Sequence, residues 1–497
     1  MTLKIAIVGA GSIGFTRRLV RDILSVPEFA DTRFAFQDIS ERNLDMVASL
    51  CRREIEANGV GATIDATLAR EPALTGADYV INTARVGGLE GFRTDVEIPL
   101  KYGVDQCVGD TICAGGLMYG QRTVPMIVEL TEQIERYAHA GTTLLNYANP
   151  MAMNTWAALD TSPVNTIGLC HGVQGGHRLL AHLFERRVND GRHPDDPGYR
   201  RVTKADVDIV AAGINHQTWY VKVLFEGRDW ARDLLELFEA DEAIREREKV
   251  RIDIIRRFGH FSTESNGHLS EYLPWYRKRP DEIPDWISTD TWIHGETAGY
   301  LRACTENRNW FETDFAKHLE AEPASFDPAR RSDEHGSWII EAMETGRVYR
   351  GHFNVRNRDV IPNLPADAIV EVPGYVDRNG LAIPVVGDLP LGAAAICNNS
   401  IQVQRMATRA AMTGDVELLK QAVLLDPLVG AVCNPPEVWQ MVDEMLVAQA
   451  QWLPQYASQI EGARKRLATG PSLARNASDG AVRLKPRTVE EMRAAGR

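Results

Sequence analysis

A glycine-rich turn near the start of the chain most constrains its fold. Residues 3–8 form a short apolar run of the kind that a buried parallel strand shows, and residues 15–24 are typical of a helix. The residues between them have the spacing G-x-G-x-x-G, in which the glycines permit a tight turn and a close approach of the backbone to a pyrophosphate. The free N–H groups of the following helix favour the same anion. The sequence therefore predicts a dinucleotide-binding strand–turn–helix unit whose cofactor contacts are Gly9, Gly11, Ser12, Ile13 and Gly14.

An acidic residue follows the second predicted strand. This strand covers residues 33–37 and ends at Asp38, where a carboxylate is placed to accept hydrogen bonds from the adenosine ribose. Because a 2'-phosphate would be repelled there, Asp38 favours NAD as the cofactor. The alternative is that Asp38 caps the N-terminus of a helix ahead of Glu41.

Strands and helices alternate through the first half of the chain, as a doubly wound parallel sheet of the Rossmann type requires. Further strands are predicted at 77–83, 141–147 and 165–169, and a helix at 123–139 has Pro125 in its first turn. Ligands collect beyond the carboxyl ends of the strands in such a sheet. Five residues fall at these ends and are expected to share one cleft: Gly9, Asp38, Arg85, Asn149 and Cys170.

The length of 497 residues favours two domains. The polar segment at 189–198 interrupts the pattern and indicates a boundary near 190–205, so we expect an NAD-binding α/β domain at 1–200 and a larger mixed α/β domain for substrate, metal and oligomerisation at 201–497. The net charge of −13 argues against nucleic acid or an anionic membrane as a partner. No apolar run approaches the ~18 residues of a spanning helix, and the first residues do not resemble a signal peptide, which predicts a cytoplasmic location. The seven scattered cysteines do not indicate a disulfide framework.

A cysteine and a histidine downstream of these strands suggest a metal site. Cys170 follows the strand at 165–169, and His216 follows a predicted strand at 207–212. Thiolate and imidazole are good ligands for a borderline or soft divalent ion, and a catalytic site leaves positions open for substrate. With only two protein ligands, oxygens of the substrate would complete the coordination shell. The alternative is a small buried cysteine and a histidine satisfied in the core.

Taken in order, the motifs resemble those of glycoside hydrolase family 4, the NAD-dependent glycosidases that do not use a pair of catalytic carboxylates. The resemblance covers most of the first 280 residues. Its motifs are Gly9-Ala10-Gly11-Ser12, Arg85-Val86-Gly87-Gly88 with Arg93 and Asp95, Gly109-Asp110-Thr111, Asn149-Pro150, Cys170-His171-Gly172-Val173, Gly213-Ile214-Asn215-His216, Thr263-Glu264-Ser265 and Glu271-Tyr272. The family is similar in fold to lactate and malate dehydrogenases, with a larger substrate domain. The resemblance also implies a homodimer or homotetramer.

The resemblance implies hydrolysis of an α-glycoside by transient oxidation. NAD oxidises the sugar hydroxyl on carbon 3, a base removes the acidified proton on carbon 2, and elimination expels the aglycone. Water then adds to the enone and the hydride returns, so that NAD is regenerated in each turnover. A divalent metal ion, typically manganese, binds the oxygens on carbons 2 and 3 and stabilises the enolate as a Lewis acid.

The resemblance also implies roles for individual residues of this sequence. Cys170 and His216 match the metal ligands, and Asn149 matches a residue that contacts substrate and cofactor. Arg93 matches a substrate-contacting arginine, with a surface salt bridge to Asp95 as the alternative.

The motifs leave several candidates for the general acid and the general base. Asp110 and His171 flank the expected site, and either could protonate the leaving oxygen; alternatively, Asp110 caps the turn after it and His171 only shapes the pocket. We favour Tyr272 as the base, because a phenol near a metal ion loses its proton more easily. The other candidates in this region are His260, Glu264, His268 and Glu271.

The tripeptide Cys170-His171-Gly172 resembles the uronic acid group of the family, which predicts an α-glucuronidase or α-galacturonidase that acts on a small hexuronide. Thr263-Glu264-Ser265 instead resembles α-galactosidase members, which keeps an α-galactoside as the alternative substrate. Two other classes stay open. A hydroxy-acid dehydrogenase would accumulate NADH, and a non-catalytic NAD-binding regulator would need no metal.

Overall fold

A single sheet of twelve strands runs through the computed structural model, which describes residues 2–475 and 479–495. The strands of the first half are β1 (Lys4–Val8), β2 (Arg33–Gln37), β3 (Thr63–Thr67), β4 (Tyr79–Asn82), β5 (Thr143–Asn146) and β6 (Asn165–Gly168). They lie in the order β3-β2-β1-β4-β5-β6, and each neighbouring pair is parallel. The predicted doubly wound parallel sheet is therefore confirmed.

The helices of the first half cover this sheet, with one difference from the prediction. They are α1 (Phe15–Leu24), α2 (Glu41–Asn58), α3 (Arg70–Leu74), α4 (Gly88–Lys101), α5 (Cys113–Tyr137), α6 (Met151–Thr161) and α7 (Gly172–Asn189). Helix α5 begins at Cys113 rather than at residue 123, so that Pro125 lies inside it. A proline there cannot donate to the carbonyl of Gln121, four residues earlier. Nε2 of Gln455 donates to that carbonyl instead, at 2.6 Å.

The strands of the second half extend the same sheet beyond β6. They are β7 (Asp208–Ile214), β8 (Gln217–Phe225), β9 (Arg228–Asp229), β10 (Tyr349–Arg356), β11 (Ile369–Asp377) and β12 (Gly380–Ala382). These strands pair antiparallel in the order β10-β11-β7-β8-β9, with β12 on β11. Single residue pairs join β6 to β10, at Gly168 and Asn354, and β11 to β7, at Glu371 and Gly213. The sheet therefore changes from parallel to antiparallel at the end of β6.

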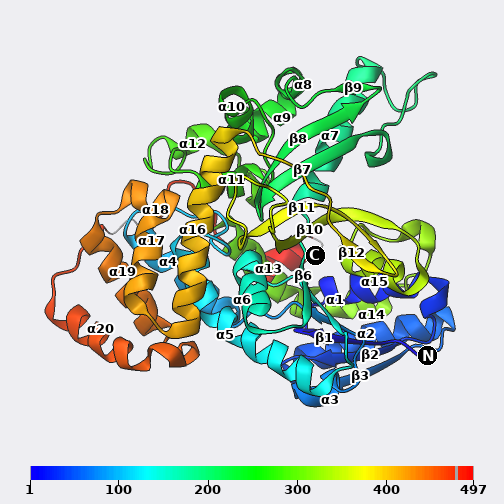
Figure 1. The fold of residues 1–497 in the computed structure, drawn as a ribbon, viewed down its shortest axis with the longest axis horizontal. Helices are drawn as coiled ribbons and strands as arrows, with labels where there is room; N and C mark the ends of the chain where they lie inside the picture. Colours follow the sequence, from blue (N-terminus) through cyan, green and yellow to red (C-terminus); the bar gives the residue numbers. More distant parts are fainter. Residues whose placement is uncertain (1, 476–478, 496–497) are drawn as a thin grey trace.

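The helices of the second half include one group beyond α5 and another that contacts the helices of the first half. They are α8 (Leu234–Ala240), α9 (Glu242–Arg247), α10 (Lys249–Phe258), α11 (Asn266–Tyr272), α12 (Ile283–Trp286), α13 (Gly299–Thr313), α14 (Phe315–Glu320), α15 (His335–Thr345), α16 (Leu391–Thr413), α17 (Val416–Leu425), α18 (Pro427–Val432), α19 (Pro435–Ala448), α20 (Ala457–Thr469) and α21 (Val489–Ala494). Figure 1 shows α16–α20 gathered in one helical layer beyond α5. By contrast, α13, α14 and α15 return to the first half and contact α4, α2 and α1. The domain division at residue 200 stays a prediction.

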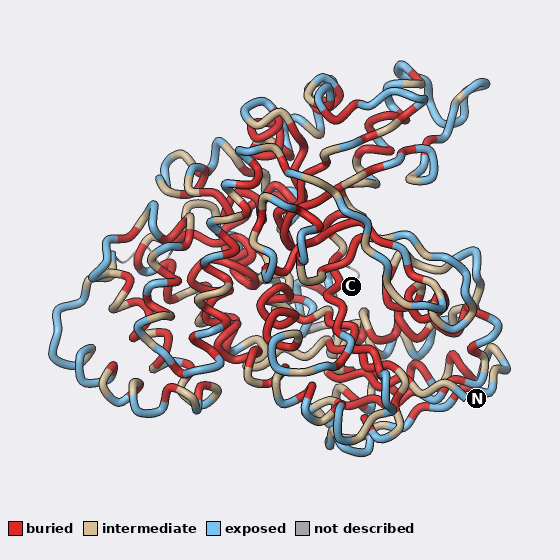
Figure 2. Tube along the Cα trace, viewed as in Figure 1, coloured by how far each residue is buried: buried red, intermediate tan, exposed pale blue. Residues whose placement is uncertain are grey.

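The core follows the sheet and the helical layer. In Figure 2 the buried segments run through the sheet and between α5 and α16, while the outer loops are exposed. One apolar cluster surrounds β1 and β2 with Phe34 and Phe36, and another packs α5 against α16, α17 and α19. Among the described residues, we find no helix with the length and apolar character needed to cross a membrane.

Two buried acids hold the loop between α4 and α5, which carries Asp110. Asp105 forms an ion pair with Arg277, and neither side chain is more than 4% exposed. Glu271 accepts backbone hydrogen bonds from residues 107–109, at 2.8, 3.1 and 3.0 Å. Because Glu271 and Arg277 belong to the second half of the chain, the position of this loop depends on contacts between the two halves.

Replacing Asp105 with alanine is expected to destabilise the protein by about 3–5 kcal/mol, because Arg277 would be left buried and unpaired. Thermal unfolding followed by circular dichroism would show this as a lower melting temperature. The matched control is Asp233→Ala, which removes the partner of Arg228 in an ion pair whose side chains are 52% and 46% exposed. That change is expected to cost less than about 1 kcal/mol. Equal effects of the two substitutions would contradict the role given to Asp105.

Glu271 is expected to make stability depend on pH. Burial raises the pKa of Glu271 to about 7 from an ordinary value of 4.5, against the backbone donors and Arg277, which lower it. The folded protein therefore binds the proton more tightly than the unfolded chain, and the contribution of Glu271 to stability falls as pH rises from about 4.5 to about 7. Glu271→Gln does not titrate at this position, so the melting temperature of wild type should fall relative to that of the variant as pH rises across this window. A difference between the two melting temperatures that does not change with pH would contradict the assignment.

Candidate active site

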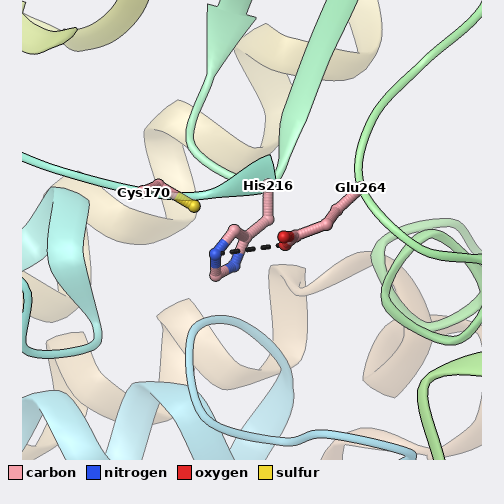
Figure 3. A group of neighbouring side chains, drawn as sticks. All are labelled: Cys170, His216 and Glu264. Atoms are coloured by element: carbon pink, nitrogen blue, oxygen red, sulfur yellow. Dashed lines mark ion pairs between the residues drawn. The ribbon is translucent and has the colours of Figure 1, made fainter. Parts of the chain in front are cut away.

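Three side chains meet beyond the carboxyl ends of β6 and β7, two strands that β10 and β11 separate in the sheet. Cys170 follows β6, His216 lies in the turn between β7 and β8 with a φ of +60°, and Glu264 precedes α11. One ligand atom from each of the three lies within 4.8 Å of the others. Figure 3 shows His216 between the other two side chains, with its 3.2 Å contact to Glu264 drawn as a dashed line. The structure thus brings the predicted ligands together and adds Glu264, which the sequence offered only as a base.

The ionisation of this cluster suits a cation. Burial lowers the pKa of His216 to about 4, so the imidazole is neutral near pH 7 and keeps a lone pair for a ligand bond. Burial raises the pKa of the Cys170 thiol well above its usual value, and Glu264 adds to the effect; a bound cation would favour the thiolate instead. Oε2 of Glu264 is buried and accepts no hydrogen bond from the described residues. This set of sulfur, nitrogen and carboxylate donors fits a borderline divalent metal ion.

Two hydroxyl groups orient the imidazole of His216. Oγ1 of Thr111 and the hydroxyl oxygen of Tyr272 each lie 3.2 Å from Nδ1, while Nε2 lies 3.2 Å from Oε2 of Glu264. Contacts of this kind fix the ring of a metal-binding histidine. Tyr272 is fully buried, and burial raises the pKa of its phenol well above the usual value. The surrounding protein groups therefore keep Tyr272 protonated, and the easier ionisation expected from the sequence would require the metal ion.

Asp110 connects two strand ends of the parallel sheet. Its carboxylate accepts hydrogen bonds from Nδ2 of Asn149, beyond β5, and from Oγ1 of Thr111, both at 2.9 Å. Nη2 of Arg85, beyond β4, lies 3.7 Å from Oδ2 of Asp110. The first backbone amides of α5 donate to other side chains, from Cys113 to Asp426 and from Gly115 to Gln106, so Asp110 does not cap this helix. The structure thus brings together Arg85, Asp110 and Asn149 at the predicted edge of the sheet.

His171 is held by a glutamate that the sequence did not reveal. Nε2 of His171 lies 2.6 Å from Oε2 of Glu334, and the ring stacks on that of Tyr147. Burial by itself would lower the pKa of His171, but the hydrogen bond and the charge of Glu334 outweigh it and raise this pKa. The His171 side chain is 45% exposed, so a ligand can reach it. No motif marks Glu334, which lies just before α15, and no spacing relates it to His171.

The glycine-rich turn packs directly against Asp38. The N–H of Gly11 donates to Oδ2 of Asp38 at 2.8 Å, and a Cβ on Gly11 would lie 2.8 Å from the same oxygen. Glycine is needed for this approach. The N-cap of α2 is Ser40 and not Asp38, so the capping alternative for Asp38 is wrong. A cavity of about 740 Å³ opens over the turn at Ser12, Ile13 and Gly14, which fits the predicted dinucleotide site.

Arg93 lies apart from this cluster. It is exposed on α4, and the described residues offer it no hydrogen bond or ion pair. The alternative salt bridge to Asp95 is not formed, because Asp95 pairs with the buried Arg122 at 2.6 Å. Of the remaining base candidates, His268 lies beside the cluster, with its ring centroid 4.6 Å from that of His216. His260 instead lines a different cavity.

Comparison with known proteins identifies the family. The family model "Family 4 glycosyl hydrolase" matches residues 4–185, and "Family 4 glycosyl hydrolase C-terminal domain" matches residues 211–429. An α-galactosidase of Rhizobium meliloti is 56% identical over 494 residues, which cover 99% of this chain and 97% of that protein. In Bacillus subtilis, an α-galactosidase is 32% identical over 91% of this chain and 99% of that protein. An α-galacturonidase of the same organism is 29% identical over 89% of this chain and 97% of that protein.

Solved structures share the fold. The lplD protein of Bacillus subtilis superimposes with a TM-score of 0.76 at 27% identity, over 90% of this chain and 100% of that one. A 6-phospho-α-glucosidase from gut microorganisms, in complex with NAD and Mn²⁺, superimposes with a TM-score of 0.74 at 20% identity, over 91% of this chain and 99% of that one. Together with the full-length relatives, the two family models show that this chain belongs to family 4 of the glycosyl hydrolases.

Proposed function

We propose that this family 4 glycosyl hydrolase is an NAD- and manganese-dependent α-galactosidase. The cluster of Cys170, His216 and Glu264 carries the proposal, because it adds a donor set for a divalent metal to a fold that also holds a dinucleotide turn. The two α-galactosidases, 56% and 32% identical to this chain, favour an α-galactoside as the substrate. An α-hexuronide, the main expectation from the sequence, has weaker support from the galacturonidase at 29% identity. A cytoplasmic location and a homodimer or homotetramer stay predictions.

The residues present suit both cofactors. The glycine-rich turn and Asp38 would hold NAD, and the three clustered side chains would hold the metal ion; a related 6-phospho-α-glucosidase structure contains NAD and Mn²⁺. When bound, NAD would supply hydride transfer at carbon 3 of the sugar, and the metal ion would supply Lewis acidity toward the sugar oxygens.

The remaining side chains orient the sugar and move protons. Both carboxylate oxygens of Asp110 accept hydrogen bonds, which suits an orienting group, and Asn149 beside it keeps Oδ1 for a sugar or cofactor hydroxyl. We assign the acid to His171, because Nε2 faces Glu334 and leaves Nδ1 to carry a proton to the leaving oxygen. Tyr272 stays the proposed base, since its hydroxyl lies beside His216. The substrate contact of Arg93 stays a prediction.

A panel of nitrophenyl α-glycosides tests the reaction and the sugar together. With NAD, Mn²⁺ and a reductant that keeps Cys170 reduced, we expect nitrophenol release from the α-galactoside and little release when NAD or Mn²⁺ is omitted. Faster release from the α-galacturonide or α-glucuronide would favour the uronide alternative. NADH formed in stoichiometric amounts without nitrophenol would indicate a dehydrogenase, and NAD binding without turnover would indicate a regulator.

Cys170→Ser tests the metal centre independently of turnover. Loss of the thiolate is expected to weaken Mn²⁺ binding by about tenfold or more, measured as free Mn²⁺ by electron paramagnetic resonance. The matched control is Cys51→Ser, a buried cysteine within α2, which should leave the Mn²⁺ affinity unchanged. If Cys170→Ser bound Mn²⁺ as tightly as wild type, the sulfur would not be a ligand.

A further inference from the structure

An aromatic cavity opens on the second half of the chain, apart from the catalytic cluster. It has a volume of about 650 Å³ and is lined by four aromatic side chains, Phe258, Trp275, Tyr276 and Trp286. These side chains come from the end of α10, the segment after α11 and the end of α12, helices that Figure 1 shows together at the upper left. None of the three clustered side chains that could hold a metal ion lines this cavity.

Contacts to α10 and α11 hold the wall of the cavity in place. The hydroxyl of Tyr276 donates to Oδ2 of Asp253 on α10, and Nδ2 of Asn266 on α11 donates to the carbonyl oxygen of Trp286, both at 2.9 Å. The rings of Tyr276 and Trp286 meet edge to face, with their centroids 4.9 Å apart. The cavity is therefore a preformed part of the fold, as sites for small molecules usually are.

The indole of Trp275 remains accessible in this wall. Phe258 stacks with it at a centroid distance of 5.9 Å, and Tyr276 meets its edge at 6.2 Å. Among the described residues, no other aromatic ring or cation packs on this indole, and Trp275 is 40% exposed. The face of an aromatic ring is its electron-rich part, so it attracts C–H groups that carry a small positive charge.

Charged groups of both signs lie around the aromatic side chains. Arg279 pairs with Glu282 at 2.6 Å, and their side chains are 60% and 42% exposed. Lys278 makes no hydrogen bond or ion pair with the part of the chain that the structure describes. A neutral ligand with many hydroxyl groups can accept from the cations and donate to the carboxylate. An anion would be repelled by Glu282, and a cation by Lys278.

A galactose ring matches this combination of groups. Its axial hydroxyl on carbon 4 leaves the C–H bonds of carbons 3, 4 and 5 on the opposite face of the ring. That apolar face can lie flat on an indole, while the hydroxyls at the edge of the ring reach the polar groups around it. The accessible indole and the charges of both signs therefore favour a neutral sugar over an ion.

We propose that this cavity is a second carbohydrate site, in which Trp275 stacks on a galactose unit of an α-galactoside. The choice of galactose rests on the proposed function, whereas the aromatic wall does not. Because the site lies outside the catalytic cluster, it binds the sugar without cleaving it.

Fluorine NMR of the full chain labelled with 5-fluorotryptophan tests the site directly. The chain has ten tryptophans, and the signal of Trp275 is the one that Trp275→Phe removes. With Mn²⁺ withheld so that the sugar is not cleaved, we expect methyl α-galactoside to shift the signals of Trp275 and Trp286, with half of the effect at about 1–10 mM. The signal of Trp439, on α19 and bonded to Glu417, is the internal control and should not move.

Trp275→Ala separates this site from catalysis. The substitution should abolish the shift of the Trp286 signal, while kcat and KM for nitrophenyl α-galactoside with NAD and Mn²⁺ stay as in wild type. A Trp275 signal that methyl α-galactoside leaves unchanged, or a fall in kcat in Trp275→Ala, would overturn the second site. A signal that moves with protein concentration instead would assign this face to a second copy of the chain and overturn it as well. These results would leave the proposed function standing, whereas wild type that releases no nitrophenol would overturn the proposed function and not the binding measurement.

Discussion

The close pairing of β6 with β10 is the contact on which the rest of the site depends. Gly168 lies opposite Asn354 there, and a Cβ on Gly168 would lie 2.9 Å from Cβ of Asn354 and 2.4 Å from Sδ of Met151. Only a residue without a side chain lets the parallel strands approach the antiparallel ones so closely. Because Cys170 lies just beyond this glycine, the pairing places its sulfur beside the turn that carries His216.

The burial that follows from this pairing determines the protonation of Cys170 and His216. Removal from water disfavours charged forms, which lowers the pKa of His216 to about 4 and raises that of Cys170. The imidazole is therefore ready to bind a cation, whereas the thiol must release a proton as the cation enters. A buried acid, Glu371, accepts a hydrogen bond from Thr218 at 3.2 Å, and its backbone pairs with that of Gly213 where β11 meets β7. Glu371 thus connects the strands that carry His216 to the pairing of β11 with β7.

The parts of the fold that could be predicted are those with a local signal. The strand, the glycine spacing and Asp38 lie within the first 38 residues, and each element obeys a short-range rule. Cys170 and His216 were identified as ligands by resemblance, because two isolated residues carry little signal by themselves. Helix α5 shows where a local rule fails: Pro125 indicates a first turn, but Gln455 supplies the missing donor to Gln121 from a distant segment.

Prediction of the substrate from a short local motif has the same limit. The tripeptide Cys170-His171-Gly172 favoured uronides, whereas the relatives that match the whole chain at higher identity are α-galactosidases. A sugar is recognised by a pocket assembled from many segments, so three consecutive residues describe only part of it. Similarity over the whole chain includes the other segments, and for that reason we give it more weight.

By itself, the sequence determined the class of cofactor, the parallel sheet and the family, because glycine spacing, apolar runs and motif order are read along the chain. Only the tertiary structure decided that Glu264 completes the ligand set, that Glu334 holds His171, and that aromatic side chains of three segments line one cavity. His171 and Glu334 are 163 residues apart, and no periodicity or spacing rule acts over such a distance. Their contact exists because the sheet continues through both halves of the chain and brings the distant segments to one edge.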